Sequence, residues 1–274
     1  MKKSFVFVFI TALALSCKTN DATPEVVCSP TIVGNNYVAT KFTYDANGRV
    51  ISGEVDDIPV KFEYTGDYIT KMIFANADAS RGVVIENDAQ NRPWKAKKVY
   101  TSADFNFTSD FVLSYDANGR LSTMKVDFKG DFQLLMVNRF EYDSKGNVLK
   151  HFIKEDANPE FVWMELSGYD DKKNINKAVK LNPLVLFYEP LNVFEYQSEN
   201  NFTVAKSRVK NSEYIGPVYS ADVKYNYTAY NSNGYPTAGT QSFTTERTDY
   251  NDPTLTKTIK ESGSTALKLD YFCK

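Results

Sequence analysis

The sequence predicts an all-β protein, a large antiparallel up-and-down meander of about 16–18 strands that is barrel-like or strongly curled. Three observations lead to this fold class. Aromatic residues make up 14% of the 274 residues, including 18 Tyr and 19 Phe, and such side chains fit the pleated surface of a strand. Apolar and polar residues alternate at period two in many segments. A turn motif that begins with Tyr-Asp recurs along the chain, which indicates a repeated supersecondary unit.

Residues 1–16 are predicted to be a lipoprotein signal peptide. Lys2 and Lys3 form a positive start, and the apolar run from Phe5 to Leu15 is too short to span a bilayer as a helix. The junction that ends at Cys17 resembles a bacterial lipobox, in which cleavage precedes a cysteine that receives lipid. The alternative is ordinary cleavage nearby, with Cys17 left as a thiol.

The segment 17–34 is predicted to be the lipidated cysteine and a tether. It is polar, contains Pro24 and Pro30, and has no periodic apolar pattern, as expected of a spacer between a lipid anchor and a folded domain. Lys18 stands where an inner-membrane retention signal would place Asp, so the lipobox resemblance implies the outer membrane, on its periplasmic face or at the cell surface. Residues 35–274 then form a single β-repeat domain.

The overall charge argues against nucleic acid as a partner. The formal net charge is −2, and removal of Lys2 and Lys3 with the signal changes it to −4, that is −2 minus 2. A mildly acidic surface is a poor binder of nucleic acid or anionic lipid. The predicted membrane contact is therefore the lipid anchor.

Cys28 and Cys273 are predicted to form a disulfide. Export places the chain in an oxidising compartment, and these two thiols remain once Cys17 carries lipid. A bridge between opposite ends of the domain would place the first strand beside the last one. The alternative is two unpaired buried thiols.

The Tyr-Asp motif is the main repeat. Tyr44-Asp-Ala-Asn-Gly-Arg-Val50 recurs as Tyr115-Asp-Ala-Asn-Gly-Arg-Leu121, and a weaker copy begins at Tyr142. The tyrosines at 115, 142, 169 and 196 are each 27 residues apart, and looser copies begin at 87, 230 and 250. We predict that the motifs are hairpin turns. The structural turn positions are Tyr44, Asp45, Gly48, Tyr115, Asp116, Gly119, Tyr142, Asp143 and Gly146.

The residue types of the motif suit a type I turn with a bulge. The carboxylate of Asp45 can accept a hydrogen bond from the backbone two residues further on. Gly48 supplies the positive φ that ends such a turn and begins the next strand.

The segments beside the turns alternate as half-buried strands do. Val60 and Phe62 share one face, whereas Lys61 and Glu63 share the other. The same pattern occurs in 38–44, 111–115 and 124–128. The stretch 174–188 breaks the alternation, and there we predict a longer loop or a short helix.

The Tyr-Asp-x-Asn-Gly-Arg motif resembles the YD repeat of large bacterial wrapping proteins, although those proteins carry far more repeats. As a whole, the chain is more similar to a group of secreted Bacteroidetes lipoproteins, a domain-of-unknown-function family with a porin-like fold. The shared features, over about residues 35–272, are the Cys17 junction, the serial turns, and the segments 169–174 and 198–202. The resemblance implies a large barrel-like β structure on an anchored surface protein, and it supplies no catalytic residue.

The sequence offers no catalytic residue, cofactor motif or metal site. The Asp-x-Asn-Gly turns lack the further oxygen ligands of a calcium loop, and no phosphate loop or nucleophile elbow occurs. We interpret His151, the single histidine, as a strand residue rather than a base. Glu160 and Glu165, on either side of Trp163, are the first candidates for paired hydrolytic carboxylates. Enzymatic activity stays open, with a non-enzymatic role favoured.

The favoured function is a lipid-anchored envelope or surface protein whose β scaffold binds a glycan or an envelope protein. Rigid, amphipathic aromatic side chains suit such contacts. The alternatives are an exported carboxylate-dependent glycoside hydrolase and a purely structural envelope component. A transmembrane barrel is the structural alternative, but several turns follow alternating runs shorter than the roughly ten residues that such strands need.

Overall fold

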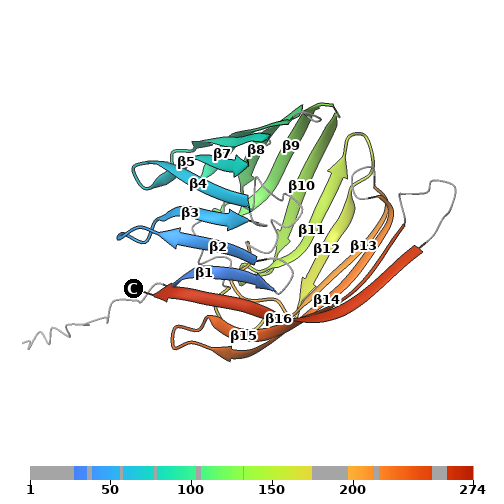
Figure 1. Cartoon of the computed structure of the whole chain (residues 1–274). Helices are drawn as coiled ribbons and strands as arrows, with labels where there is room; N and C mark the ends of the chain where they lie inside the picture. Colours follow the sequence, from blue (N-terminus) through green and yellow to red (C-terminus); the bar gives the residue numbers. More distant parts are fainter. Residues whose placement is uncertain are drawn as a thin grey trace, which may run out of the picture.

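The computed structural model describes residues 28–35, 39–55, 58–76, 79–102, 106–131, 133–174, 197–212, 216–248 and 258–273. All regular elements in these ranges are β-strands, which together form a closed barrel of 16 strands (Figure 1). The strands are β1 (Cys28–Asn35), β2 (Ala39–Tyr44), β3 (Val50–Val55), β4 (Ile58–Thr65), β5 (Tyr68–Asn76), β6 (Ala79–Asn87), β7 (Pro93–Ser102), β8 (Asn106–Tyr115), β9 (Leu121–Gly130), β10 (Leu134–Tyr142), β11 (Val148–Glu155), β12 (Phe161–Ser167), β13 (Val204–Ser212), β14 (Gly216–Tyr230), β15 (Pro236–Thr248) and β16 (Thr258–Cys273).

The predicted fold class is confirmed, and the sheet does close. Every strand pairs antiparallel with its neighbours in the chain, and β1 pairs with both β2 and β16. Short connections allow this meander, because antiparallel neighbours need no crossover. The signal peptide, Cys17 and most of the predicted loop or helix at 174–188 lie outside the described residues.

The first and last strands meet at the seam of the barrel. Their register places Cys28 opposite Cys273, and Cys273 takes part in a disulfide. The sequence predicts that Cys28 is the disulfide partner of Cys273, and this pairing stays a prediction.

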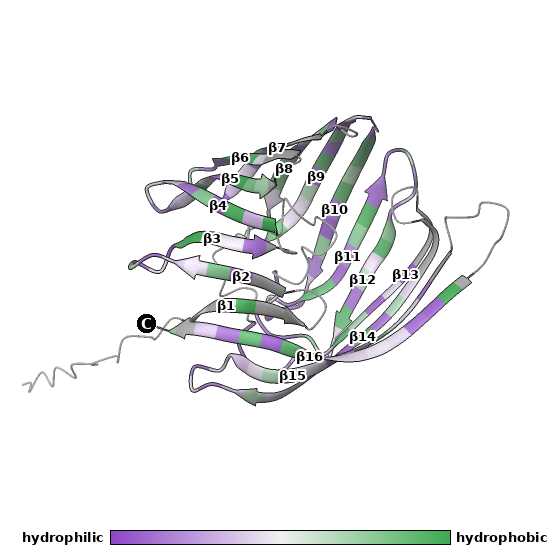
Figure 2. Cartoon of the chain, in the orientation of Figure 1, coloured by the Kyte–Doolittle hydropathy of each residue, from purple (hydrophilic) through white to green (hydrophobic). Residues whose placement is uncertain are grey.

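The apolar core lies on the inner side of the wall. Val60 and Phe62 on β4 are buried, whereas Lys61 and Glu63 between and beside them are exposed, as the period-two pattern predicts. Buried residues from β2 to β13 form one continuous cluster along this side. Hydrophobic and hydrophilic residues alternate as bands along β10 and β11 in Figure 2.

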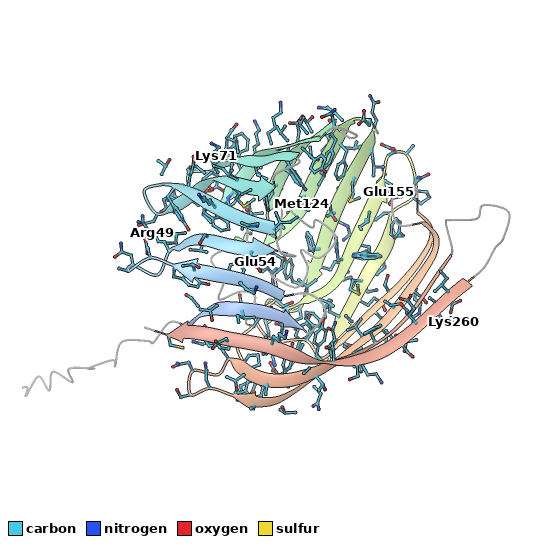
Figure 3. The ribbon with its side chains drawn as sticks, viewed as in Figure 1. Arg49, Glu54, Lys71, Met124, Glu155 and Lys260 are labelled. Atoms are coloured by element: carbon cyan, nitrogen blue, oxygen red, sulfur yellow. The ribbon has the colours of Figure 1, made fainter. Side chains whose placement is uncertain are left out.

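The outer side of the wall carries the charges. Figure 3 shows Met124 inside the barrel and Lys71 and Lys260 on its outside. Met124 is fully buried, and the lysines belong to ion pairs with acids of adjacent strands. In the described part of the chain, no helix has both the length and the apolarity to cross a membrane.

Candidate functional site

The first Tyr-Asp motif closes the turn between β2 and β3. Asp45 Oδ1 accepts hydrogen bonds from the backbone N–H groups of Asn47 at 2.8 Å and Arg49 at 2.9 Å. The N–H of Gly48 donates to the carbonyl oxygen of Asp45 at 3.0 Å, and Gly48 has a φ of 78°. This is the geometry that the residue types of the motif favour.

Four later turns repeat this geometry, and the one between β14 and β15 uses Asn231 in place of Asp. Asp88, Asp116 and Asp143 each accept two backbone N–H groups through one carboxylate oxygen, at 2.8–2.9 Å. Gly119 and Gly146 have φ values of 77° and 89°, and in the turn between β6 and β7 Asn91 takes this position with a φ of 61°. Asn tolerates this left-handed region better than most residues, so the looser copy still closes its hairpin.

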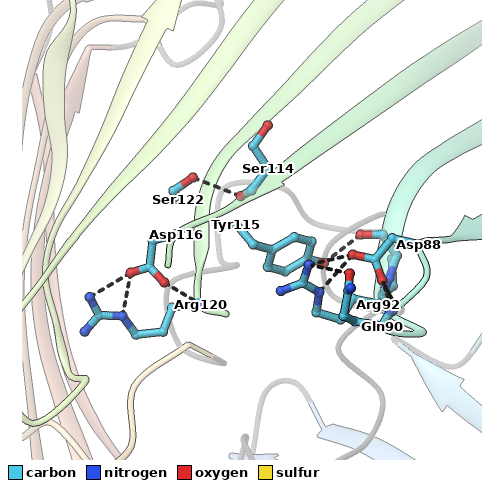
Figure 4. Close-up of polar contacts among 9 residues, drawn as sticks. Asp88, Gln90, Arg92, Ser114, Tyr115, Asp116, Arg120 and Ser122 are labelled. Carbon is cyan, nitrogen blue, oxygen red and sulfur yellow. Dashed lines mark hydrogen bonds and ion pairs between the residues drawn. The ribbon is translucent and has the colours of Figure 1, made fainter. Parts of the chain in front are cut away.

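The arginine that ends the motif has a role that sequence reasoning missed. Arg49, Arg92 and Arg120 each donate from Nε to the Asp of their own turn, at 2.7, 2.9 and 2.7 Å. Each guanidinium also lies over the ring of the next tyrosine along the rim, at 5.3, 4.1 and 4.5 Å from the centroid. Figure 4 shows Arg92 with Asp88 and Tyr115 in this arrangement. The motif thereby links neighbouring hairpins as well as closing its own.

The tyrosine hydroxyls add hydrogen bonds between neighbouring strands beyond the point where the backbone pairing of those strands ends. The pairing of β9 with β10 ends at Thr123, and the carbonyl of Leu121, two residues further on, accepts the Tyr142 hydroxyl at 2.7 Å. In three other strand pairs the accepting carbonyl also lies two residues beyond the last paired residue: β3–β4, β7–β8 and β11–β12. These hydrogen bonds run from Tyr64 to Val50, from Tyr115 to Pro93 and from Tyr169 to Val148. Between β5 and β6 the amide of Asn87 donates to Ile69 instead. We call these side-chain hydrogen bonds the rim ladder.

Protonation at the rim follows from this geometry. Backbone and guanidinium hydrogen bonds from Arg49 hold the pKa of Asp45 below its usual value, so the carboxylate is ionised at neutral pH. Burial raises the pKa of Tyr64 to about 12, so its hydroxyl stays protonated and can donate. Within the described ranges, no group of three or more His, Cys, Asp or Glu side chains could hold a metal ion.

The segment from Gln197 to Thr203 differs from the turn copy that the 27-residue spacing predicts. It packs as a strap against two other turns and leads into β13. Asn200 donates from its backbone to Asn147 at 2.8 Å, and the Ser198 hydroxyl accepts from the Val148 N–H at 3.0 Å. Asp170 accepts from the side chain of Asn201 at 3.0 Å. Polar side chains that satisfy buried backbone groups explain why this segment lacks an apolar period.

Tyrosines of β14 form a second feature, which we call the tyrosine row: Tyr225, Tyr227 and Tyr230. The rings of Tyr225 and Tyr227 stack at 6.1 Å with an interplanar angle of 11°, and Tyr230 follows at 6.4 Å. Phe202 meets Tyr225 edge-on at 5.3 Å, on the side of the apolar core. All three tyrosines are half-buried, unlike the buried phenylalanines of the core.

Small and polar neighbours surround the tyrosine row. Gly239 lies directly opposite Tyr227 in the register, and Gln241 Nε2 donates to the Tyr225 hydroxyl at 3.2 Å. The Tyr230 hydroxyl donates to Asp170 at 2.9 Å, and burial together with this carboxylate raises the pKa of Tyr230 to about 12. Sequence reasoning did not single out these residues, although the two-residue spacing of Tyr225 and Tyr227 indicates a shared face of a strand.

The two candidate acids belong to outer-wall ion pairs. Glu160 binds Arg139 through both carboxylate oxygens, at 3.0 and 2.6 Å, and these bonds raise the pKa of Arg139. Glu165 is exposed and lies 3.5 Å from Lys150. Trp163 is buried in the core cluster, so the structure does not place it on the surface beside these acids.

His151 lies on β11 with its imidazole fully buried. Its ring stacks on Phe140 at 4.7 Å, and Nε2 lies 2.8 Å from Asn138 Oδ1. Burial lowers the pKa of His151 to about 3, so the side chain is neutral at physiological pH. This is a packed strand position rather than an accessible base.

Comparisons with known proteins relate the chain to porin-like structures rather than to similar sequences. No family model matches the sequence, and no curated protein matches it. A porin-like protein from Bacteroides vulgatus ATCC 8482 is similar in structure, with a TM-score of 0.53 and 13% identity over 88% of this chain and 98% of that one. A porin-like protein from Bacteroides uniformis ATCC 8492 has a TM-score of 0.49 and 9% identity over 91% and 96%. At this level of identity the likeness to the first protein shows a shared porin-like fold.

Proposed function

We propose that the protein is a non-enzymatic, lipid-anchored envelope protein whose barrel binds an uncharged glycan at the tyrosine row. The observation that carries this proposal is the row of Tyr225, Tyr227 and Tyr230 along one strand, in which the first two rings stack and the third is tilted by 53° from the second. Sugar rings pack their C–H faces against aromatic rings, and a row of half-buried rings suits a chain of sugars better than a compact ligand.

The chemistry beside the row supports a neutral ligand. The high pKa of Tyr230 keeps its hydroxyl uncharged, and the hydroxyls of the row can exchange hydrogen bonds with sugar hydroxyls. Gln241 adds an amide at Tyr225, which suits the same kind of partner. The acids that would support hydrolysis, Glu160 and Glu165, are engaged in ion pairs on the opposite side of the wall.

The topology supports an anchor at the rim of the Tyr-Asp turns. Those turns follow the even-numbered strands, and β16 also ends at this rim, where Cys273 lies opposite Cys28. The chain that precedes β1 therefore enters at the same rim, so lipid on Cys17 would hold this rim towards the membrane. The charged outer wall favours anchoring over insertion, because Lys or Arg at a bilayer midplane costs about 2–4 kcal/mol.

Two experiments test the proposal. Glycan-array binding by residues 17–274 carrying Cys17→Ser should be lost with Tyr227→Ala and kept with Tyr68→Ala, which removes an exposed tyrosine at the β4–β5 hairpin. Blank arrays with the unsubstituted chain would contradict the glycan assignment. In cells, a clickable fatty acid should label the full chain and fail to label Cys17→Ser; equal labelling of both would contradict the anchor.

A further inference from the structure

Several lysines on the outer wall are placed opposite acids. Four cross-strand pairs show this directly, because their members are register partners and also form ion pairs: Lys41 with Glu54, Lys71 with Glu63, Lys150 with Glu165, and Lys260 with Glu246. Opposite charges across an antiparallel pair stabilise the sheet, so this arrangement is the expected one.

In one row of the outer wall, lysines alternate with valines across successive strands, and we call it the lysine row. Going from β7 to β11, the register runs Lys95, Val112, Lys125, Val137, Lys154, each residue directly opposite the next. Lys125 therefore has a valine on both sides in place of an acid. Glu86 lies opposite Lys95 at the β6 end of the row.

The side chains of the lysine row point away from the barrel interior. Lys125 lies between the fully buried Met124 and Val126, and Lys154 lies between the fully buried Ile153 and Glu155. Lys125 and Lys154 are exposed and Lys95 is half-buried. Val112, between two of the lysines, is 41% exposed, so the row presents both positive charge and apolar surface to solvent.

The spacing of the charges indicates the shape of a partner. Successive lysines of the row are two strands apart, which corresponds to roughly 9–10 Å. The row runs from β7 to β11 in a closed barrel of 16 strands, so it follows a curved surface over about a quarter of the circumference. A flat bilayer can touch such a convex row at few points, whereas a flexible linear polyanion can follow it.

We propose that the lysine row binds an acidic polysaccharide that carries one carboxylate or sulfate on every second sugar. The acidic groups would meet the three lysines, and the sugars between them would pack their C–H faces on Val112 and Val137. The nearest aromatic side chain is Trp94, whose ring centroid lies 3.9 Å from the Lys95 ammonium. A single ring does not provide the series of stacking platforms that a single-stranded nucleic-acid site uses. The overall net charge of −2 predicts weak attraction for anions, but Lys125 and Lys154 have valines and no acid as their register partners, which leaves local positive charge along the row. This site lies on the opposite side of the wall from the tyrosine row and does not depend on it.

The test is binding of residues 17–274 with Cys17→Ser to hyaluronan oligosaccharides of about ten sugars, measured by biolayer interferometry at two salt concentrations. Hyaluronan carries one carboxylate per disaccharide, and a neutral chito-oligosaccharide of equal length is the comparison. We expect affinity to fall with salt and to fall about tenfold when Lys95, Lys125 and Lys154 are all changed to Gln.

The matched control changes Lys206, Lys224 and Lys268 to Gln. These exposed lysines lie on β13, β14 and β16, and their loss changes the net charge equally. We expect this control to keep hyaluronan affinity within about twofold, and Tyr227→Ala to keep it as well. Equal losses from the two triple variants, absence of salt-sensitive hyaluronan binding, or tighter binding to oligothymidine or to phosphatidylglycerol vesicles would each overturn the proposal. Circular dichroism of both variants verifies that the barrel is intact.

Discussion

Removal of one tyrosine hydroxyl from the rim ladder should measurably destabilise the barrel. Tyr142→Phe keeps the ring and its contact with the Arg120 guanidinium, 4.5 Å from the centroid. It removes the 2.7 Å hydrogen bond to the carbonyl of Leu121, a residue that is 2% exposed. A hydrogen bond contributes about 0.5–1.5 kcal/mol, and an unsatisfied buried acceptor costs about 1–3 kcal/mol. We therefore expect a loss of about 1–2 kcal/mol in the free energy of unfolding.

The measurement is urea unfolding followed by far-ultraviolet circular dichroism, with the disulfide kept oxidised. An unchanged slope with a lower midpoint would mean that stability, and not compactness, has changed. Tyr68→Phe is the control, because this side chain is 41% exposed and lies outside the ladder. It should change the free energy of unfolding by less than about 0.5 kcal/mol.

Additivity gives a second check on the same reasoning. Tyr64 donates to Val50 in a part of the rim ladder far from Tyr142. The double variant Tyr64→Phe with Tyr142→Phe should therefore lose an unfolding free energy equal to the sum of the two single losses. A midpoint for Tyr142→Phe equal to that of the unsubstituted protein would refute the idea that these hydroxyls complete the sheet. So would a control that loses as much stability as the variant.

Four further predictions follow from the described geometry. Burial raises the pKa of Tyr64 to about 12 from its unfolded value near 10. The stabilising effect of the protonated hydroxyl should therefore persist below pH 10 and be lost as the pH rises towards 12. Tyrosinate absorbance and circular dichroism should change together over this range. His151 is neutral and buried with a pKa of about 3, so its imidazole proton signal should not titrate from pH 7 to 5. The free energy of unfolding should decline as the pH falls from 6.5 towards 3, and His151→Gln should reduce this decline. Gly119→Ala should cost about 1–2 kcal/mol because of its φ of 77°, whereas Gly119→Asn should cost less since Asn91 occupies that conformation in another turn; equal thermal shifts would contradict this. Cys273→Ser should lower stability by roughly 5 kcal/mol in the chain-entropy account of disulfides, and peptide mapping without reductant should recover Cys273 joined to Cys28 in the parent protein.

The fold was largely predictable because its determinants are local. Alternation such as that of Val60 and Phe62 with Lys61 and Glu63 defines which face of a strand is buried, and each turn needs only six or seven consecutive residues. Antiparallel hairpins then pair neighbours in sequence. Closure was suggested by the positions of Cys28 and Cys273 and appears in the structure as the β1–β16 register.

The links between hairpins were not predictable in the same way. The hydrogen bond from Tyr142 to Leu121 joins residues 21 positions apart, and it depends on where the ladder between β9 and β10 ends. The strap at 197–203 resembled another turn because Asn and Asp serve both to close turns and to satisfy buried backbone groups. The lysine row is visible only once the register of five strands is known, since no residue in it is unusual by itself.

Closure between β1 and β16 has a consequence for how the chain is made. A polypeptide is synthesised from its N-terminus, so β1 is available before the other described strands, whereas its partner β16 comprises residues 258–273, the last 16 described residues. Until synthesis is complete, β1 keeps an uncovered backbone edge on which another nascent chain could template. A late stop codon that removes β16 would therefore uncover two edges, at β1 and β15, and should give polymers rather than a slightly shorter monomer.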